Sequence, residues 1–103
     1  MIKISTSPKL YRLDGGPLQS LGNDLTVGTA ISGILAAKRS KDPVRAYNLA
    51  KKFADQDEVE LSVSDFTFVR KEIDNDEGWN NTTIGQLFIH LDEAKNGNTT
   101  DSE

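Results

Sequence analysis

Apolar residues at helical spacing, in separate stretches, are the feature that most constrains the fold of this chain. Side chains three and four positions apart lie on one face of a helix. Val27, Ile31, Ile34 and Leu35 form such a face, and two later stretches repeat the pattern. The members of these stretches are Phe66, Val69 and Ile73, followed by Ile84, Leu87, Phe88 and Leu91. We expect all of them in one core.

The segment from Asp42 to about Ala54 predicts a further helix, which is apolar around well over half of its circumference. Its apolar residues are Val44, Ala46, Tyr47, Leu49, Ala50, Phe53 and Ala54. A helix that is apolar on most sides is usually enclosed by other elements. We therefore expect this helix to be the central one, with Tyr47 in the core.

Polar residues that accept hydrogen bonds from unpaired backbone N–H groups mark the expected helix starts. They are Asp24 or Thr26, Asp42 before Pro43, Ser62 in a capping box with Asp65, and Thr83 in a second box with Gln86. Asn96-Gly97 predicts the end of the last helix, because glycine readily adopts the left-handed conformation found there. Gly28 and Gly33, on the first helix, each cost about 1 kcal/mol relative to alanine. They indicate close approach of another backbone, or they are simply tolerated.

The first 20 residues have the features of extended chain. Leu10–Leu13 contains strand-forming residues, and Asp14-Gly15-Gly16 is a strong turn signal. Because two strands alone are marginally stable in water, a hairpin here must pack on the helices. The expected fold is mainly α (α+β), with a short N-terminal β-hairpin packed on a compact bundle of about four helices. We expect one globular domain over residues 1–97 and a disordered polar tail over residues 98–103.

The composition excludes several classes of protein. The 103 residues include no cysteine, so the chain has no disulfide, thiolate nucleophile or Cys-ligated metal site. The longest apolar run, Ile34–Ala37, is far shorter than the ~20 residues of a membrane-spanning helix. The first residues lack the apolar region of a signal peptide. We therefore expect a cytoplasmic protein with no membrane contact.

Charge is distributed unevenly along the chain. Residues 1–53 hold nine Lys and Arg against three Asp and Glu, whereas residues 54–103 hold three against thirteen. Such halves can present a basic face and an acidic face to different partners. They can also attract each other and largely neutralise within the fold, which is the interpretation we favour.

Few residues suggest catalytic, metal or phosphate chemistry. His90, the only histidine, lies beside the core stripe of the last helix, and we interpret Asp74 and Asp76 as solvated loop carboxylates. Residues 74–78 resemble a calcium loop but lack the glutamate at its twelfth position. The glycines match no dinucleotide or P-loop motif. We expect no enzymatic activity, no cofactor and no metal.

Nucleic-acid binding is the alternative interpretation. The two helices joined near Ser40–Asp42 resemble a helix-turn-helix within residues 26–54. The expected contacts are Arg45, Asn48 and Lys52 on the recognition helix, and Lys38, Arg39 and Lys41 at phosphates. The net charge of −4, the expected burial of the second helix and the preference for cations near helix C-termini argue against this role.

Apolar residues away from the expected core faces favour a protein-binding surface. Phe68 and Ile89 lie far from the core stripes of their helices, and Trp79 lies in the polar loop between those helices. Aromatic residues contribute strongly to interfaces. Asp65, Glu72, Asp76 and Glu77 would add an acidic rim. The alternative is that these helices are covered on both sides, or that Trp79 folds onto the core.

The order of these segments resembles small proteins of about 100 residues that are encoded by bacteriophages and prophages. The segments that carry the resemblance are Asp14–Gly16, Leu25–Gly28, Ala46–Lys52, Glu60–Asp65 and Ile84–Leu87. The resemblance implies an accessory or assembly role inside a bacterial host cell or on the virion, and tail-assembly chaperones are one class of similar size. We expect a non-enzymatic protein that acts by binding another phage or host protein, or itself.

Overall fold

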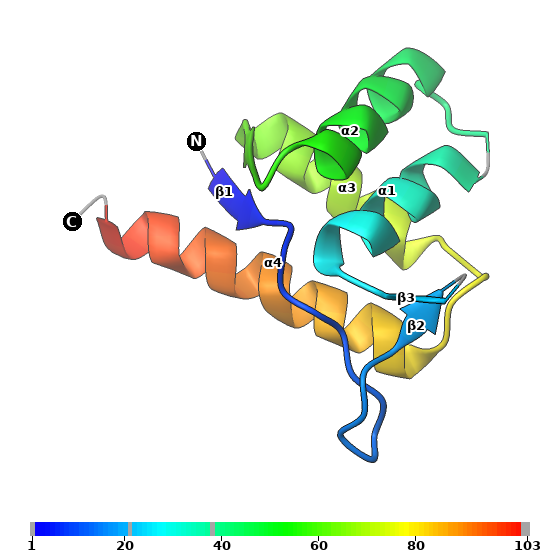
Figure 1. Cartoon of the computed structure of the whole chain (residues 1–103). Coiled ribbons are helices and arrows are strands. Elements are labelled where there is room, and N and C mark those ends of the chain that lie inside the picture. Colours follow the sequence, from blue (N-terminus) through cyan, green and yellow to red (C-terminus); the bar gives the residue numbers. More distant parts are fainter. Residues whose placement is uncertain (1, 21, 38, 102–103) are drawn as a thin grey trace.

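Four helices and four short strands make up the chain in the computed structural model, which describes residues 2–20, 22–37 and 39–101 (Figure 1). The helices are α1 (Val27–Ala37), α2 (Pro43–Asp55), α3 (Val63–Asp74) and α4 (Asn81–Asp101). The strands are β1 (Ile2–Ser5), β2 (Gln19–Ser20), β3 (Asn23–Asp24) and β4 (Glu58–Leu61). This confirms the expected mainly α class, with short N-terminal strands packed on about four helices.

Three of the expected helix caps are present. The Thr29, Arg45 and Asp65 amides donate to the side chains of Thr26, Asp42 and Ser62, at 3.2, 3.2 and 3.1 Å. Each bond satisfies an N–H group that the first turn of a helix leaves unpaired.

The expected boundaries of the last helix were wrong at both ends. α4 begins two residues before Thr83, and the Thr83 amide donates to Asn80 Oδ1 at 3.1 Å. Asn80 is therefore the cap, since its amide oxygen serves as well as a hydroxyl. At the other end the helix continues through Asn96-Gly97 to Asp101, because glycine lowers helix stability without forbidding helical geometry. Ser102 and Glu103 of the expected tail lie outside the described residues.

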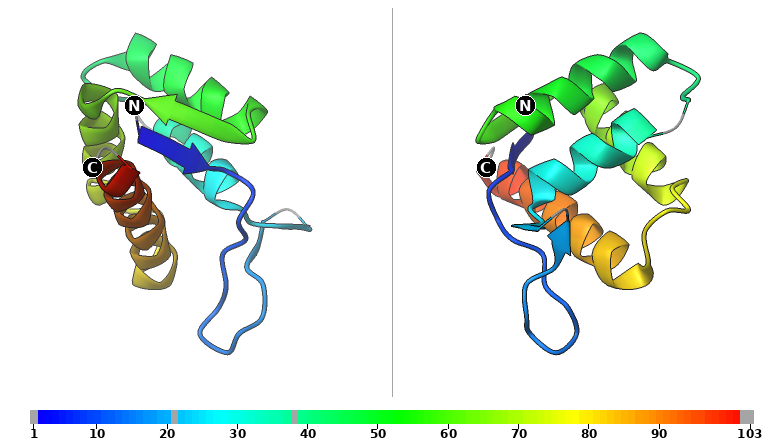
Figure 2. Two further views of the ribbon diagram at one scale, coloured as in Figure 1. Left: turned by 90° about the vertical axis from the view of Figure 1, so that its left-hand side faces the viewer. Right: turned by 45° about the vertical axis from the view of Figure 1, so that its right-hand side comes forward.

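The central helix is α1, and the expectation that the second helix is central was wrong. Val27, Ala30 and Ile31 are fully buried in α1, which packs against α2, α3 and α4. α2 buries one face only, whereas Val44 and Tyr47 are 69% and 65% exposed. Much of the apolar circumference of α2 is alanine, which gains little from burial. α2 therefore lies on the outside of α1, antiparallel to it (Figures 1 and 2).

A two-stranded antiparallel sheet joins the N-terminus to the middle of the chain. β1 pairs with β4, with Ile2 opposite Leu61 and Ile4 opposite Val59. These four side chains are buried, and Lys3 and Glu60 form an ion pair of 3.9 Å on the outer face. The sequence predicted extended chain in the first 20 residues but not its pairing with β4, because strand pairing across 50 residues leaves no local signal. The sheet places isoleucines of β1 in the core, which the helical stripes did not predict.

The expected turn at Asp14-Gly15-Gly16 is present, but the hairpin around it is irregular. Gly15 has φ of 91°, and the Arg12 amide donates to the Gly16 carbonyl at 2.7 Å. Beyond the turn only a single bridge joins Tyr11 to Pro17. The regular pairing follows later, between β2 and β3. The predicted hairpin is thus a turn at the end of a longer loop.

The two glycines of α1 predict opposite responses to alanine. A Cβ at Gly28 would lie 2.5 Å from Thr6 Cβ and 2.7 Å from the Phe53 carbonyl oxygen, whereas a Cβ at Gly33 meets nothing within 4 Å. We expect Gly28→Ala to lower the free energy of unfolding by roughly 1–3 kcal/mol through overpacking. We expect Gly33→Ala to raise it by about 1 kcal/mol through helix propensity. Urea unfolding measures both, and equal effects of the two substitutions would contradict the close approach at Gly28.

Candidate functional site

A cleft of about 610 Å³ lies where the α1–α2 loop meets α3. It is lined by Arg39, Ser40, Lys41, Asp42, Arg45, Phe68, Lys71, Glu72, Asn75 and Glu77. Ser40 and Asp42 belong to the turn that starts α2, where the Asp42 amide donates to Ser40 Oγ at 3.1 Å. The cleft exists because the antiparallel packing of α2 on α1 brings this turn beside the second half of α3.

The Phe68 ring and the Arg45 side chain form the most structured part of the cleft. The Arg45 guanidinium carbon lies 5.3 Å from the centroid of the Phe68 ring, within cation–π range. Arg45 Nε is also 3.7 Å from an Asp42 carboxylate oxygen and 3.5 Å from an Asp65 carboxylate oxygen. Two carboxylates from different elements thus hold the guanidinium over the half-buried ring. The cleft therefore contains an aromatic ring with a guanidinium lying over it.

Charged side chains of both signs surround this aromatic surface. Arg39, Lys41 and Lys71 are exposed cations on the rim, and Glu72 and Glu77 are its acids. Within residues 2–20, 22–37 and 39–101, none of these five groups lies within ion-pair distance of an opposite charge. A ligand that presents an apolar side chain between charged groups would fit this cleft, because the rim can form ion pairs with positive and with negative groups.

The structure brings two of the five expected partner-binding residues into this cleft. Phe68 and Glu77 line it. Asp76 instead holds the loop, since its carboxylate accepts hydrogen bonds from the Gly78 and Trp79 amides at 3.0 Å each. Trp79 is half-buried against the core, as the alternative interpretation expected, and Phe68 packs partly against the core as well. Ile89 is 58% exposed on α4 and does not line the cleft.

The expected nucleic-acid residues divide between this cleft and a hollow farther along α2. Arg39, Lys41 and Arg45 line the cleft, whereas Asn48 and Lys52 line a separate hollow of about 400 Å³. Lys38 lies outside the described residues. Because α2 lies on the surface, its burial no longer argues against nucleic-acid binding. The antiparallel arrangement of α1 and α2 does, since a helix-turn-helix crosses at about 90–120°.

Ion pairs between the basic half and the acidic half of the chain account for only some of the charged residues. Arg45–Asp65 and Lys3–Glu60 join the two halves. The other ion pairs among the described residues lie within one half, at Lys9–Asp24, Arg12–Asp14, Arg45–Asp42 and Arg70–Asp92. In addition, the cleft brings cations of the first half beside acids of the second. Mutual neutralisation therefore leaves several of these charges free for a partner.

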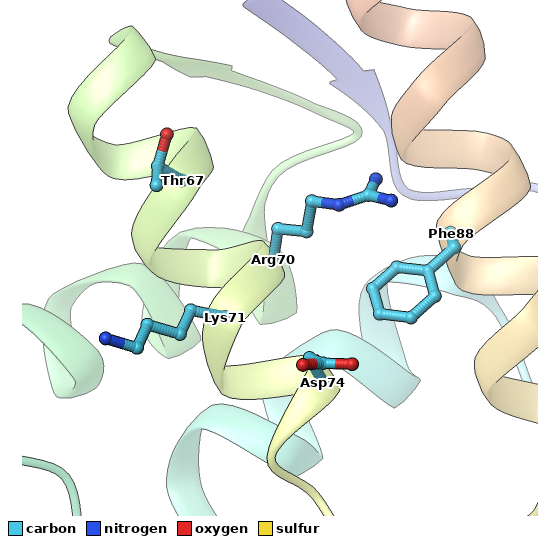
Figure 3. A pocket seen from close by; sticks show the side chains of 5 residues that line it. All are labelled: Thr67, Arg70, Lys71, Asp74 and Phe88. Carbon is cyan, nitrogen blue, oxygen red and sulfur yellow. The ribbon is translucent and has the colours of Figure 1, made fainter.

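A shallower groove separates α3 from α4 (Figure 3). The Phe88 ring points from α4 toward α3, and the Arg70 guanidinium carbon lies 4.6 Å from its centroid. Arg70 also pairs with Asp92. The groove has a volume of about 340 Å³ and is lined by Thr67, Arg70, Lys71, Asp74 and Phe88. A single basic side chain thus covers its aromatic wall.

The loop between β1 and β2 projects from the body of the molecule (Figures 1 and 2). Leu13 lies at its turn and is 93% exposed. The turn is held by the Gly16 amide, which donates to Asp14 Oδ1 at 2.9 Å, and by an Arg12–Asp14 ion pair of 3.4 Å. An almost fully exposed leucine in an ordered turn has no role in the core.

The base of this loop is attached to the body at two places. The Tyr11 amide donates to Gln86 Oε1 at 2.9 Å, and Gln86 Nε2 donates to the Tyr11 carbonyl at 2.7 Å. Lys9 Nζ lies 2.9 Å from Asp24 Oδ2. This ion pair and a hydrogen bond from Gln19 lower the pKa of Asp24, and the same pair raises the pKa of Lys9.

Sequence reasoning missed Leu13, Lys71 and Asn75 as surface candidates, whereas it placed Glu72 in the expected acidic rim. Phe68, Glu72 and Asn75 follow helical spacing on a face away from the α3 core stripe, and that signal was available. Leu13 was instead interpreted as a strand former, because nothing local distinguishes an exposed leucine from a buried one.

The residues considered for catalysis and metal binding are not assembled into a centre. His90 lines a hollow of about 270 Å³ with residues of β1 and with Glu93. Among the residues that the structure describes, no three His, Cys, Asp or Glu side chains are grouped to hold a metal ion. In that same part of the chain, no helix combines the length and apolarity needed to cross a membrane.

Comparison with known proteins found no matching family model, no matching curated protein and no matching solved structure.

Titration of Asp24 tests the attachment of the loop. We expect its carboxyl pKa, followed by NMR, to lie below the ordinary value, and to rise in Lys9→Gln because the main partner is lost. The contribution of the pair to stability should disappear as the pH falls through the lowered pKa of Asp24. It should also disappear as the pH rises through the raised pKa of Lys9. Lys3→Gln is the matched control, and an equal change in both variants would contradict the Lys9–Asp24 pairing.

Proposed function

We propose that this protein is a non-enzymatic accessory or assembly protein of a bacteriophage or prophage, and that it works by binding protein. The cleft beside α3 is the proposed contact surface, and the partner is another protein or a second copy of the chain. The phage setting, and with it a location in the bacterial cytoplasm or on the virion, follows from the resemblance of the sequence to small phage-encoded proteins.

The observation that supports this proposal is the arrangement of Phe68 under Arg45, within a rim of charges that have no ion-pair partner in the described part of the chain. Aromatic and arginine side chains are enriched at the energetic centres of protein interfaces, and charged groups dominate their rims. Because Arg45 already lies within ion-pair distance of two carboxylates, part of its side-chain freedom is lost before a partner binds. The cleft thus combines a preformed centre with a rim that can select a partner by charge.

Site-specific photo-crosslinking tests the proposal, because a chain without cysteine can be labelled at one introduced thiol. We expect Asn75→Cys, carrying a benzophenone label in the cleft, to form a discrete protein adduct on irradiation, alone or in bacterial extract. The matched control Glu93→Cys, on α4, should not form it. The adduct should also disappear when Phe68→Ser is added and the melting temperature shows that the fold is retained.

An adduct that forms equally from both positions would contradict the proposed surface. An adduct that survives both Phe68→Ser and the double change Arg39→Glu with Lys41→Glu would contradict it as well. The double change alters only exposed loop residues, so it keeps the test informative if Phe68→Ser unfolds the protein.

A nucleic-acid-binding role is the second candidate, because Asn48 and Lys52 are exposed along the outer side of α2. A gel-shift titration separates the two roles. The protein-binding proposal expects no shift at low salt, where phosphate contacts are strongest. A shift that weakens with salt and is lost in Lys52→Glu would favour the nucleic-acid role instead.

A further inference from the structure

We propose that the partner in the cleft is a second copy of this chain, which inserts its Arg12–Gly16 turn so that Leu13 packs on Phe68. This inference rests on the proposed function and specifies its partner. The loop lies at one end of the molecule and the cleft at another, on the α1–α2 turn and α3 (Figure 1). A loop therefore meets the cleft of a neighbouring copy rather than its own.

The turn is built to present an apolar side chain. Leu13 is 93% exposed, and its backbone is fixed on both sides by the Arg12–Gly16 hydrogen bond and by the bond from Gly16 to Asp14. The Tyr11–Gln86 pair of hydrogen bonds and the Lys9–Asp24 ion pair hold the base of the loop on the body. A preformed turn loses little conformational entropy when it binds. Leu13 is therefore a ready anchor for an apolar surface.

The cleft offers space around one partly exposed apolar side chain, Phe68, among lining residues that are otherwise polar or charged. Its volume of about 610 Å³ lies within the ~300–1,000 Å³ range of pockets that enclose compact ligands. The half-buried Phe68 ring is the aromatic surface inside it. A turn with one leucine at its tip can occupy this space without displacing the core.

The charges of the turn complement those of the rim. Leu13 lies between Arg12 and Asp14, whose mutual ion pair is exposed at 3.4 Å. Exposed pairs contribute only about 0–1 kcal/mol, so this pair can separate at little cost when better partners are near. Arg12 can then face Glu72 and Glu77, while Asp14 faces the cations of the rim, Arg39, Lys41 and Lys71. Leu13, which lies between a positive and a negative side chain, is thus complementary to Phe68, which lies between side chains of both signs.

When the loop of one copy contacts the cleft of another copy, the two surfaces differ, so the interface is heterologous. Each bound copy still has a free loop at one end and a free cleft at the other, so association continues into a ring or an open chain. We therefore expect wild-type protein to form assemblies larger than dimers as its concentration rises.

Complementation between two monomeric variants tests this geometry by sedimentation velocity. Leu13→Asp removes the anchor but keeps the cleft, whereas Arg39→Glu with Lys41→Glu alters the cleft but keeps the loop. We expect each variant alone to weaken self-association by about tenfold or more. We expect an equimolar mixture to form a one-to-one dimer, because one intact loop then meets one intact cleft. Ile89→Asp, which changes an exposed apolar residue elsewhere, should associate like the wild type.

Three results would contradict self-association through the loop and the cleft. A wild-type protein that stays monomeric up to its solubility limit would overturn the inference. So would variants that each keep wild-type association, or a mixture of monomeric variants that forms no dimer. If the Asn75→Cys label still forms an adduct with another protein and Leu13→Asp leaves that adduct unchanged, the proposed function stands and only this inference fails. If the labelled cleft forms no adduct, both fail.

Discussion

The close contact of the N-terminal strand with the start of α1 and the end of α2 organises the rest of the structure. The Gly28 amide donates to the Thr6 carbonyl at 3.0 Å, and the Thr6 amide donates to the Asp57 carbonyl at 2.9 Å. The Thr6 hydroxyl donates to the Gln56 carbonyl. Three segments that are distant in sequence therefore share one junction, which only a glycine at position 28 permits. The β1–β4 pairing and the α1–α2 pair both extend from it.

The cleft follows from this arrangement. When the end of α2 is held at the junction, the start of α2 and its preceding turn must lie at the opposite end of α1, beside α3. Arg45 then reaches both the Asp65 carboxylate and the Phe68 ring. Similar contacts join α3 and α4, with Arg70 over Phe88 and Lys95 over Phe66. Basic side chains thus lie over aromatic rings at several places, and in the cleft such a pair is surrounded by charges that have no ion-pair partner among the described residues.

Local signals in the sequence were sufficient for the helices and for most of their starts. The Thr26, Asp42 and Ser62 caps and the stripes of α1, α3 and α4 could be predicted because each depends on residues within one or two turns. The capping box at Thr83 failed because Gln86 bonds to Tyr11, far away in sequence, and Asn80 caps the helix instead. For the candidate site, sequence reasoning found Phe68, Glu72 and Glu77, but it could not show that Arg45 and Phe68 meet.

The sequence by itself determined which segments are helical, where chain turns occur and which side chains are apolar, because these follow from backbone geometry and local hydrogen bonding. Only the tertiary structure decided which helix is central. It made α1 the enclosed helix and left Tyr47 exposed on α2, because burial depends on which elements surround a helix and not on its own composition. It also decided that Leu13 faces solvent, that β1 pairs with β4 and that the cleft exists. Each of these requires contacts between residues that are far apart in the chain, and no local pattern encodes those distances.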